Sequence, residues 1–299
     1  MIRDRSKLTT EKRNPRTANI DRLDALGIVD AINAEDARVA GAVGKERRAI
    51  AKAVEMIVTA FRAGGRLFYV GAGTSGRLGV LDASECPPTF GVRPGMVQGI
   101  IAGGRRALVR SVEGAEDQAG QGARAVEKRR VRAGDVVVGI AASGVTPFVR
   151  GALERARRAG AGTVFLTCAP EARRAAVADV VINPVVGPEA ITGSTRMKAG
   201  TATKLVLNAL STAAMIQLGK VYGNLMVDVQ ASNVKLRDRA ERIVMAGAGV
   251  GRARARRLLA SAGGRSKTAI LMARARLTRG QAQTRLKTCR GSLREALGE

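Results

Sequence analysis

The chain has 299 residues, 45% of them hydrophobic and 2% aromatic, and a formal net charge of +26 at pH 7. A chain of this length and apolar content can bury a full core, so we expect one large domain with an appendage. The complete lack of histidine excludes Ser-His-Asp and Cys-His triads and histidine zinc sites.

Apolar segments and cysteines give a first indication of location. No apolar run reaches about 18 residues, which predicts no membrane span, and the polar N-terminus predicts no signal peptide. The three cysteines form no CxxC pair and are typical of reduced thiols. We therefore expect a cytoplasmic protein.

The positive charge raises the question of nucleic-acid binding. Aromatic side chains, on which single strands stack, are nearly missing, and no zinc-finger, homeodomain or RNP pattern occurs. We therefore expect an arginine-rich solvated surface and no nucleic-acid partner.

The first part of the chain is predicted to be an arm and a helix, residues 1–46. Residues 1–34 are polar and turn-rich, with a short helical pattern over 20–32. Asn33 or Glu35 is expected to open a long helix that presents one apolar face up to Phe61 and ends at Gly64-Gly65.

Next come short apolar runs that alternate with helical stretches. Such alternation predicts a three-layer α/β sandwich with a five-stranded parallel sheet. The expected strands are 67–70, 97–101, 136–140, 164–167 and 180–182, and the expected crossover helices are 107–129, 146–158 and 170–177.

Two further helices are expected over 199–218 and 222–246. Residues 47–246 would then form the main domain. Residues 247–299, which are punctuated by glycines, would form a separate small helical unit.

A glycine-rich loop with two hydroxyls follows the first predicted strand. In Gly71-Ala72-Gly73-Thr74-Ser75-Gly76-Arg77, the glycine backbone and the hydroxyls could hold a phosphate at a helix start. Gly73, Thr74 and Ser75 are the candidate ligands. A plain strand-to-helix turn is the alternative.

A second loop of this kind, residues 139–147, follows the third predicted strand. Ser143, Gly144 and Thr146 are the candidate phosphate ligands there. Alternatively, Ser143 and Thr146 only cap the helix that Pro147 begins, a contribution of about 1 kcal/mol each.

A third polar segment, Thr192–Lys198, comes before the helix predicted over 199–218. Ser194, Arg196 and Lys198 could form an anion clamp, and the alternative is an ordinary helix start. Arg77 in the first loop is a further candidate for direct substrate contact.

Carboxylates provide the candidate acid and base. Glu85 follows the first loop by ten residues, and Glu113 and Glu116 are three apart, so on a helix they would share a face. A solvated helical face is the alternative for this glutamate pair.

Several long motifs resemble one known family. They are DASECPP at 82–88, VEGAED at 112–117, IAASGVTP at 140–147, GSTRMKAGTATK at 193–204 and GNLMVDV at 223–229. Together they resemble the bacterial N-acetylmuramic acid 6-phosphate etherases, which are built on the sugar-isomerase (SIS) domain. The likeness extends over nearly the whole chain.

The resemblance implies a lyase of peptidoglycan recycling that releases D-lactate from N-acetylmuramic acid 6-phosphate. It implies that Glu85 is the proton donor and Glu116 the second acid/base, with Glu113 as the spare candidate. Because Glu85 must hold a proton when it acts, we expect it to be buried against apolar neighbours.

The resemblance further implies no metal and no cofactor, and a homodimer with sites near the subunit interface. The C-terminal piece would be a small helical bundle that resembles ubiquitin-associated domains. Two departures from the family pattern are Val145, where a polar or basic residue is expected, and the arginine-rich C-terminus.

The main alternative is a non-catalytic SIS-domain sugar-phosphate sensor, similar to the vertebrate glucokinase regulator. That protein resembles two SIS domains in tandem, whereas this chain has room for one, which favours the enzyme. An SIS aldose–ketose isomerase is disfavoured by the lack of histidine. An SIS transcription regulator is disfavoured because residues 1–45 are too short and polar for a helix-turn-helix.

Overall fold

The computed structural model describes residues 5–173, 177–231 and 233–299. The chain divides into two compact units, each described here by itself. The first consists of the chain up to Ser84 together with Gly95–Ser211, and the second of Glu85–Pro94 together with Thr212–Glu299. The domain boundaries expected after residues 46 and 246 stay a prediction.

A five-stranded parallel sheet forms the centre of the first unit. Its strands are β1 (Leu67–Gly71), β2 (Val97–Ile101), β3 (Val136–Ile140), β4 (Gly162–Leu166) and β5 (Val180–Ile182). They lie in the order β2-β1-β3-β4-β5, all neighbours parallel. The five predicted strands are thereby confirmed, as is the parallel sheet.

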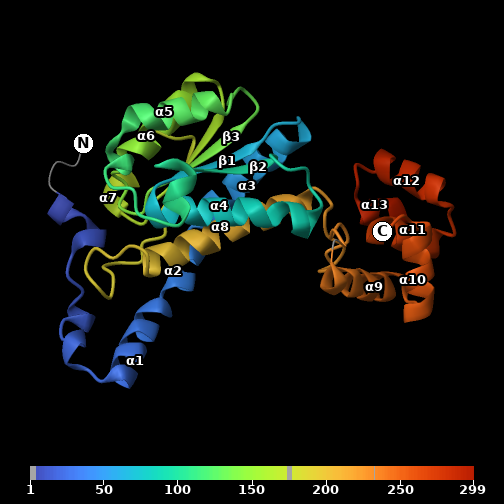
Figure 1. Cartoon of the computed structure of the whole chain (residues 1–299), viewed down its shortest axis with the longest axis horizontal. Helices are drawn as coiled ribbons and strands as arrows, with labels where there is room; N and C mark the ends of the chain where they lie inside the picture. Colours follow the sequence, from blue (N-terminus) through green and yellow to red (C-terminus); the bar gives the residue numbers. More distant parts are fainter. Residues whose placement is uncertain (1–4, 174–176, 232) are drawn as a thin grey trace. The chain divides into compact units, whose positions relative to one another are not determined.

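Helices cover both faces of this sheet (Figure 1). One face carries α3 (Arg47–Arg62), α4 (Gly73–Phe90) and α8 (Lys198–Gln217), and the other carries α5 (Ala119–Lys128) and α6 (Pro147–Arg158). The helices approach closely because glycines leave room for them. A Cβ on Gly79 of α4 would lie 2.8 Å from the Cβ of Tyr69, and one on Gly139 of β3 would lie 2.7 Å from Leu153 of α6. The predicted three-layer sandwich is confirmed.

The helix predicted over 107–129 is wrong in its first half. The connection after β2 holds two short 3-10 helices, η5 (Gly104–Leu108) and η6 (Ala115–Asp117), and α5 begins only at Ala119. Gly114 has a φ of +69°, which a continuous right-handed helix does not allow. The helices predicted over 146–158 and 199–218 are confirmed to within one residue at each end. Of the helix predicted over 170–177, α7 (Pro170–Arg173) is observed and residues 174–176 lie outside the described residues.

The N-terminal region is more broken than expected. Four 3-10 turns are followed by α1 (Ala25–Asp36), α2 (Val39–Lys45) and α3, so the single long helix predicted from Asn33 or Glu35 to Phe61 is wrong. Helix α1 starts early because the side chain of Asp24 accepts a hydrogen bond from the backbone N–H of Gly27. The four turns, η1 to η4, span Arg5–Lys7, Thr9–Glu11, Pro15–Thr17 and Ile20–Arg22.

The second unit is helical, as expected for the end of the chain. It holds α9 (Val234–Ala248), α10 (Arg252–Ser261), α11 (Ser266–Ala275), α12 (Arg279–Thr288) and α13 (Leu293–Leu297). The helix predicted over 222–246 begins only at residue 234, where the side chain of Asn233 accepts from the backbone N–H of Leu236.

The core of the second unit joins residues on both sides of position 247. Val227, Ile243 and Val244 pack in one cluster with Ile270 and Leu271. Buried Lys267 ties the segments together, because its Nζ donates to Asp228 Oδ2 at 2.7 Å and to the carbonyls of Gly219 and Gly291, each at 2.8 Å.

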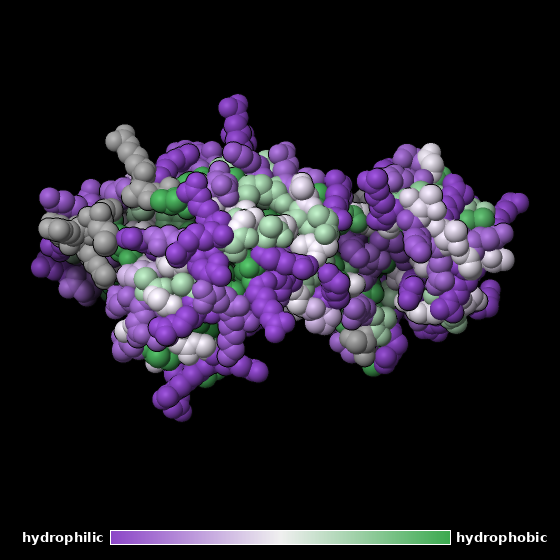
Figure 2. Space-filling model, turned by 90° about the horizontal axis from the view of Figure 1, so that it is seen from above, coloured by the Kyte–Doolittle hydropathy of each residue, from purple (hydrophilic) through white to green (hydrophobic). Residues whose placement is uncertain are grey.

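Hydrophilic side chains cover most of the face shown in Figure 2. This agrees with the solvated, arginine-rich surface expected from the composition. Among the described residues, no helix has the length and apolar character needed to cross a bilayer.

Candidate active site

The first predicted loop joins the carboxyl end of β1 to the start of α4. A Cβ on Gly71 would lie 2.7 Å from the backbone nitrogen of Gly76, and one on Gly76 would lie 2.7 Å from the carbonyl oxygen of Gly71. Glycine at both positions therefore lets the helix start directly against the strand end. Gly73, with a φ of +50°, begins the helix, and the half-buried Thr74 and Ser75 lie in its first turn.

The second predicted loop joins β3 to α6. Its turn depends on Gly144, whose φ is +78° and whose added Cβ would lie 2.1 Å from the Cβ of Ala172. Thr146 occupies the N-cap position of α6 and Pro147 its first turn, as predicted. The hydroxyl of Thr146, however, makes no capping hydrogen bond, so capping does not account for it.

The two loops lie at neighbouring strand ends. β1 and β3 are adjacent, with Gly71 opposite Ile140. From β1 the chain continues to β2, which lies next to β1 on one flank, and then crosses to β3, which lies next to β1 on the opposite flank. The direction of winding therefore reverses between β1 and β3. Ligands of open parallel sheets bind at this reversal, beyond the carboxyl ends of the strands.

The third predicted segment reaches the same end of the sheet. A Cβ added to Gly200, in the first turn of α8, would lie 3.5 Å from the Cγ2 of Thr74. Ala142 of the second loop packs against a buried cluster that contains Ala199 and Ala202 of α8. The start of α8 therefore lies against both loops.

Several hydroxyl groups in the two loops and in the segment before α8 make no hydrogen bond to another described residue. Within the described part of the chain, no hydrogen bond involves the side chain of Thr74, Ser75, Ser143, Thr146 or Ser194. All five residues are half-buried. Such hydroxyls can donate to the oxygens of a bound anion without giving up an existing bond.

Lys198 does not take part in an anion clamp, contrary to the expectation. Its side chain is 1% exposed, and its Nζ donates to Glu35 Oε2. Asn14 and Arg16 also donate to Glu35. These bonds, that of Arg16 first, lower the pKa of Glu35 from 4.5 to about 2. The ammonium group is therefore a structural partner of Glu35.

The N-terminus of α8 is occupied as well. Buried Glu189 accepts the backbone N–H of Lys198 and that of Ala199, both at 2.9 Å. A carboxylate at this position neutralises the positive end of the helix dipole. Of the predicted clamp, Ser194 and the exposed Arg196 remain. Arg196 forms no ion pair with any described residue.

Arg77 is engaged with its own chain rather than free for substrate. Its Nε donates to the carbonyl of Leu108 at 3.2 Å, and its Nη2 to that of Arg110 at 3.4 Å. These bonds tether the connection after β2 to the second turn of α4. That connection carries Glu113 and Glu116, so Arg77 holds the backbone of the segment with these glutamates against α4.

The three candidate carboxylates are all exposed in the single chain. Glu116 lies in η6, and Glu113 accepts a hydrogen bond of 2.6 Å from its neighbour Ser111. Because Gly114 interrupts the backbone between them, the two glutamates do not share a helix face. Glu85 lies on α4, and the expected burial of its side chain is not found within one chain.

One buried carboxylate of the DASECPP motif was missed by the sequence analysis. Asp82 accepts from Asn208 Nδ2 at 3.0 Å and from Ser211 Oγ at 3.1 Å, and it also bonds Tyr69. Burial raises the pKa of Asp82 in spite of these hydrogen bonds. Asp82 thereby fixes α4 to α8 behind the loops. Its only sequence signal is its place one turn before Glu85.

Comparison with known proteins decides the family. Residues 49–157 match the family model of the glucokinase regulatory protein N-terminal SIS domain. The chain is 52% identical over 294 residues to the N-acetylmuramic acid 6-phosphate etherase of Klebsiella aerogenes, covering 98% of each chain. It is 55% identical over 290 residues to that of Serratia proteamaculans (strain 568), covering 97% of this chain and 98% of the relative.

The chain belongs to the N-acetylmuramic acid 6-phosphate etherase family. This confirms the predicted family and, with it, the predicted class of carbon–oxygen lyase. The match covers nearly the full length of both chains, so the sensor alternative loses its support. The SIS match lies on the part of the chain that holds β1 to β3 and both hydroxyl-bearing loops.

Proposed function

We propose that this etherase cleaves the D-lactyl ether of N-acetylmuramic acid 6-phosphate and releases N-acetylglucosamine 6-phosphate and D-lactate. The observation that carries the proposal is the pair of loops at β1 and β3, whose unbonded hydroxyls lie where the winding of the sheet reverses. The etherase names of relatives that match 97–98% of this chain support the substrate.

The phosphate of the sugar would bind to Ser75, Ser143 and Thr146. Backbone N–H groups at the start of α4 add the positive end of a helix dipole, which favours an anion. Gly73 and Gly144 let the backbone approach the phosphate closely, and Thr74 and Ser194 complete the ring of donors. Arg196 is the cation we assign to the lactyl carboxylate.

The chemistry needs two proton-transfer groups. In the open-chain sugar, the C2–H bond lies next to the C1 aldehyde, and the ether oxygen is on C3. Glu116 removes the C2 proton and C2=C3 forms as the C3–O bond breaks. Glu85 donates a proton to the departing oxygen, which becomes the hydroxyl of D-lactate. Water then adds its hydroxyl to C3 and a proton to C2, which restores the sugar.

We also propose that the protein works as a cytoplasmic homodimer. Glu85 and Glu116 are exposed in the single chain, whereas proton transfer by a carboxylic acid at neutral pH is helped by exclusion of water. A second subunit against these glutamates would supply that exclusion. Light scattering of the purified chain tests this part of the proposal.

The decisive assay is D-lactate release from N-acetylmuramic acid 6-phosphate. Glu85→Gln and Glu116→Gln should each lower turnover by at least ~10²-fold with a smaller effect on KM. Glu116→Gln should also abolish exchange of the C2 proton with deuterated water. Glu154→Gln, which alters a surface ion pair with Arg150 on α6, is the matched control and should release lactate normally.

Each outcome has a clear meaning. No lactate from the parent protein would overturn the proposed function. Near-normal release by Glu85→Gln would remove Glu85 from its role. Retained exchange in Glu116→Gln would transfer the role of base to Glu113 or Glu85.

A further inference from the structure

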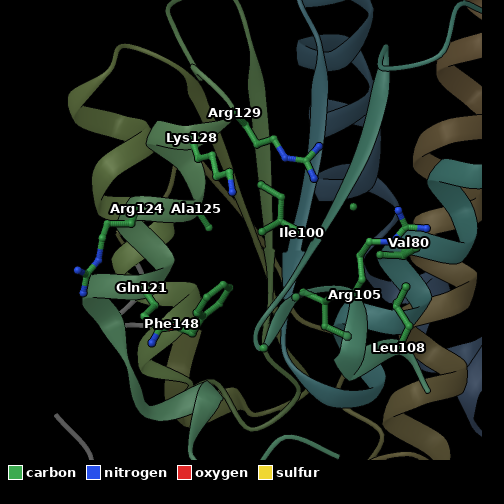
Figure 3. A pocket seen from close by; sticks show the side chains of 14 residues that line it. Val80, Ile100, Arg105, Leu108, Gln121, Arg124, Ala125, Lys128, Arg129 and Phe148 are labelled. Carbon is green, nitrogen blue, oxygen red and sulfur yellow. The ribbon is translucent and has the colours of Figure 1, made fainter. Parts of the chain in front are cut away.

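A hollow of the first unit runs along the free edge of the sheet. It has a volume of about 1020 Å³ and is bounded by the edge strand β2, by Val80 and Leu108 on one side and by α5 on the other. Figure 3 shows Val80, Leu108 and Arg105 on one side of Ile100 and Lys128 and Arg129 on the other, while the side chain of Arg124 extends outward from α5. We call this hollow the β2 groove.

The floor of the β2 groove is a strand edge. Among the strands that the structure describes, β2 is an outer strand and pairs with β1 alone. Leu67 donates to the carbonyl of Met96, and Ala102 donates to that of Gly71, so the even-numbered residues of β2 bond β1. In a parallel ladder the alternate residues point away from the neighbour. The N–H and C=O groups of Gly99 and Ile101 therefore point outward, and both residues line the groove.

The two walls of the groove differ in character. The α5 wall carries Arg124, Lys128 and Arg129, all exposed, whereas the opposite wall offers the apolar side chains of Val80 and Leu108. Arg105 adds a cation at the rim of that apolar wall.

No carboxylate is found among the described residues that line the groove. The four lining cations form no ion pair with any described residue. Glu127 of α5 does not compensate them, because it is held by Arg155 of α6 at 2.7 Å.

We propose that the β2 groove binds an extended acidic segment of a partner protein, which adds to β2 as a sixth strand. The outward backbone groups of β2 would bond the main chain of the segment. Because side chains alternate along a strand, acidic residues would face the α5 cations while aliphatic residues face Val80 and Leu108. The recognised pattern is therefore alternating acidic and aliphatic residues.

A second copy of this chain fits the groove poorly. Pairing two β2 edges would bring two sets of four cations together, and like charges in an interface are unfavourable. The open, exposed walls also favour an extended chain over a small anion, since none of the four cations is buried.

The test uses a short, end-blocked, fluorescently labelled peptide of alternating glutamate and valine. Binding is measured by fluorescence anisotropy, and we expect it to weaken as salt is added. The double variant Arg124→Ala/Lys128→Ala should bind the peptide about tenfold more weakly. Lys235→Ala/Arg237→Ala removes the same two charges from the exposed face of α9 and should leave binding within about threefold.

Strand addition is tested separately from charge. A copy of the peptide methylated at all its backbone nitrogens keeps its charge but cannot donate to β2, and it should bind about tenfold more weakly. Hydrogen exchange at the amides of Gly99 and Ile101 should slow when the unmethylated peptide is bound. A lysine–valine peptide should not bind.

Three results would overturn the proposal. They are equal binding of the methylated peptide, equal weakening by the two double variants, and unchanged exchange at Gly99 and Ile101. Displacement of the peptide by a thymidine oligonucleotide, with no effect of backbone methylation, would likewise identify a general polyanion surface. Unaltered thermal unfolding of each variant verifies that it is folded.

Discussion

Replacing Glu35 by glutamine tests whether Lys198 is a structural residue rather than a substrate ligand. Glu35 is 2% exposed and bonds Lys198, Arg16 and Asn14. Its pKa is lowered from 4.5 to about 2, a change worth about 3 kcal/mol at neutral pH. Removing one partner of a buried ion pair costs about 3–5 kcal/mol, so Glu35→Gln should lower the free energy of unfolding at pH 7 by about that amount.

The effect should depend on pH in a defined direction. A carboxylate with a lowered pKa stabilises the fold above its unfolded pKa of 4.5, and this stabilisation is lost as the pH falls toward 2. The parent protein and Glu35→Gln should therefore differ most at neutral pH, and the difference should shrink below pH 4.5. Urea unfolding followed at several pH values measures this.

Two further variants sharpen the comparison. Lys198→Met combined with Glu35→Gln removes both charges, and the double variant should be more stable than Glu35→Gln alone. Asp30→Asn on the exposed side of α1 is the control and should change the free energy of unfolding by less than about 0.5 kcal/mol. An unchanged free energy of unfolding in Glu35→Gln, or a loss independent of pH, would refute the reasoning.

The remaining predictions concern the site and the second unit. Ser75→Ala and Ser143→Ala should each raise KM for the phosphorylated sugar, because each variant loses a hydrogen bond to a charged group that is worth about 1.5–3 kcal/mol. With a dephosphorylated sugar as substrate, the parent and the two variants should differ little in KM. Arg196→Ala should raise KM strongly, and the defect should persist at high salt because a direct contact is screened less than the long-range field. Deleting residues 247–299 should impair folding, because Val227, Ile243 and Val244 lose their buried partners, and circular dichroism and light scattering of the truncated chain measure this.

Local patterns in the sequence were sufficient to predict the strands and the two hydroxyl-bearing loops of the candidate site. Each buried strand is a short apolar run, and each hydroxyl-bearing loop follows its strand directly. A parallel sheet places both loops at the same edge, and the strand order observed in the structure then makes the loops of β1 and β3 neighbours. For this reason, the positions of Ser75, Ser143 and Thr146 could be predicted from the sequence.

Backbone breaks were harder to predict. Val109 to Gln118 has the composition of a helix start, but Gly114 adopts a φ of +69° there and α5 begins later. Glycine is tolerated inside helices as well as at their ends, so its presence alone did not decide the matter. The prediction that Glu113 and Glu116 share a helix face was wrong for this reason.

The partners of the charged residues could not be predicted, because they come from distant parts of the chain. Lys198 meets Glu35 across 163 positions, and Arg77 meets the carbonyl of Leu108 across 31. A cation in a polar loop looks the same in a sequence whether it faces solvent, a substrate or a buried carboxylate. Only the fold separates these cases.

The partners of these charged groups also bear on which cation is left for the lactyl carboxylate of the substrate. The segment Thr192–Lys198 offered two candidate cations, Arg196 and Lys198, with an ordinary helix start as the alternative. Glu35 takes Lys198 and Glu189 takes the helix N-terminus, so neither positive group is left for a ligand. Arg196 stays exposed and unpaired among the described residues. The same two carboxylates that fix the start of α8 leave Arg196 exposed, and this is the reason we propose Arg196 for the lactyl carboxylate.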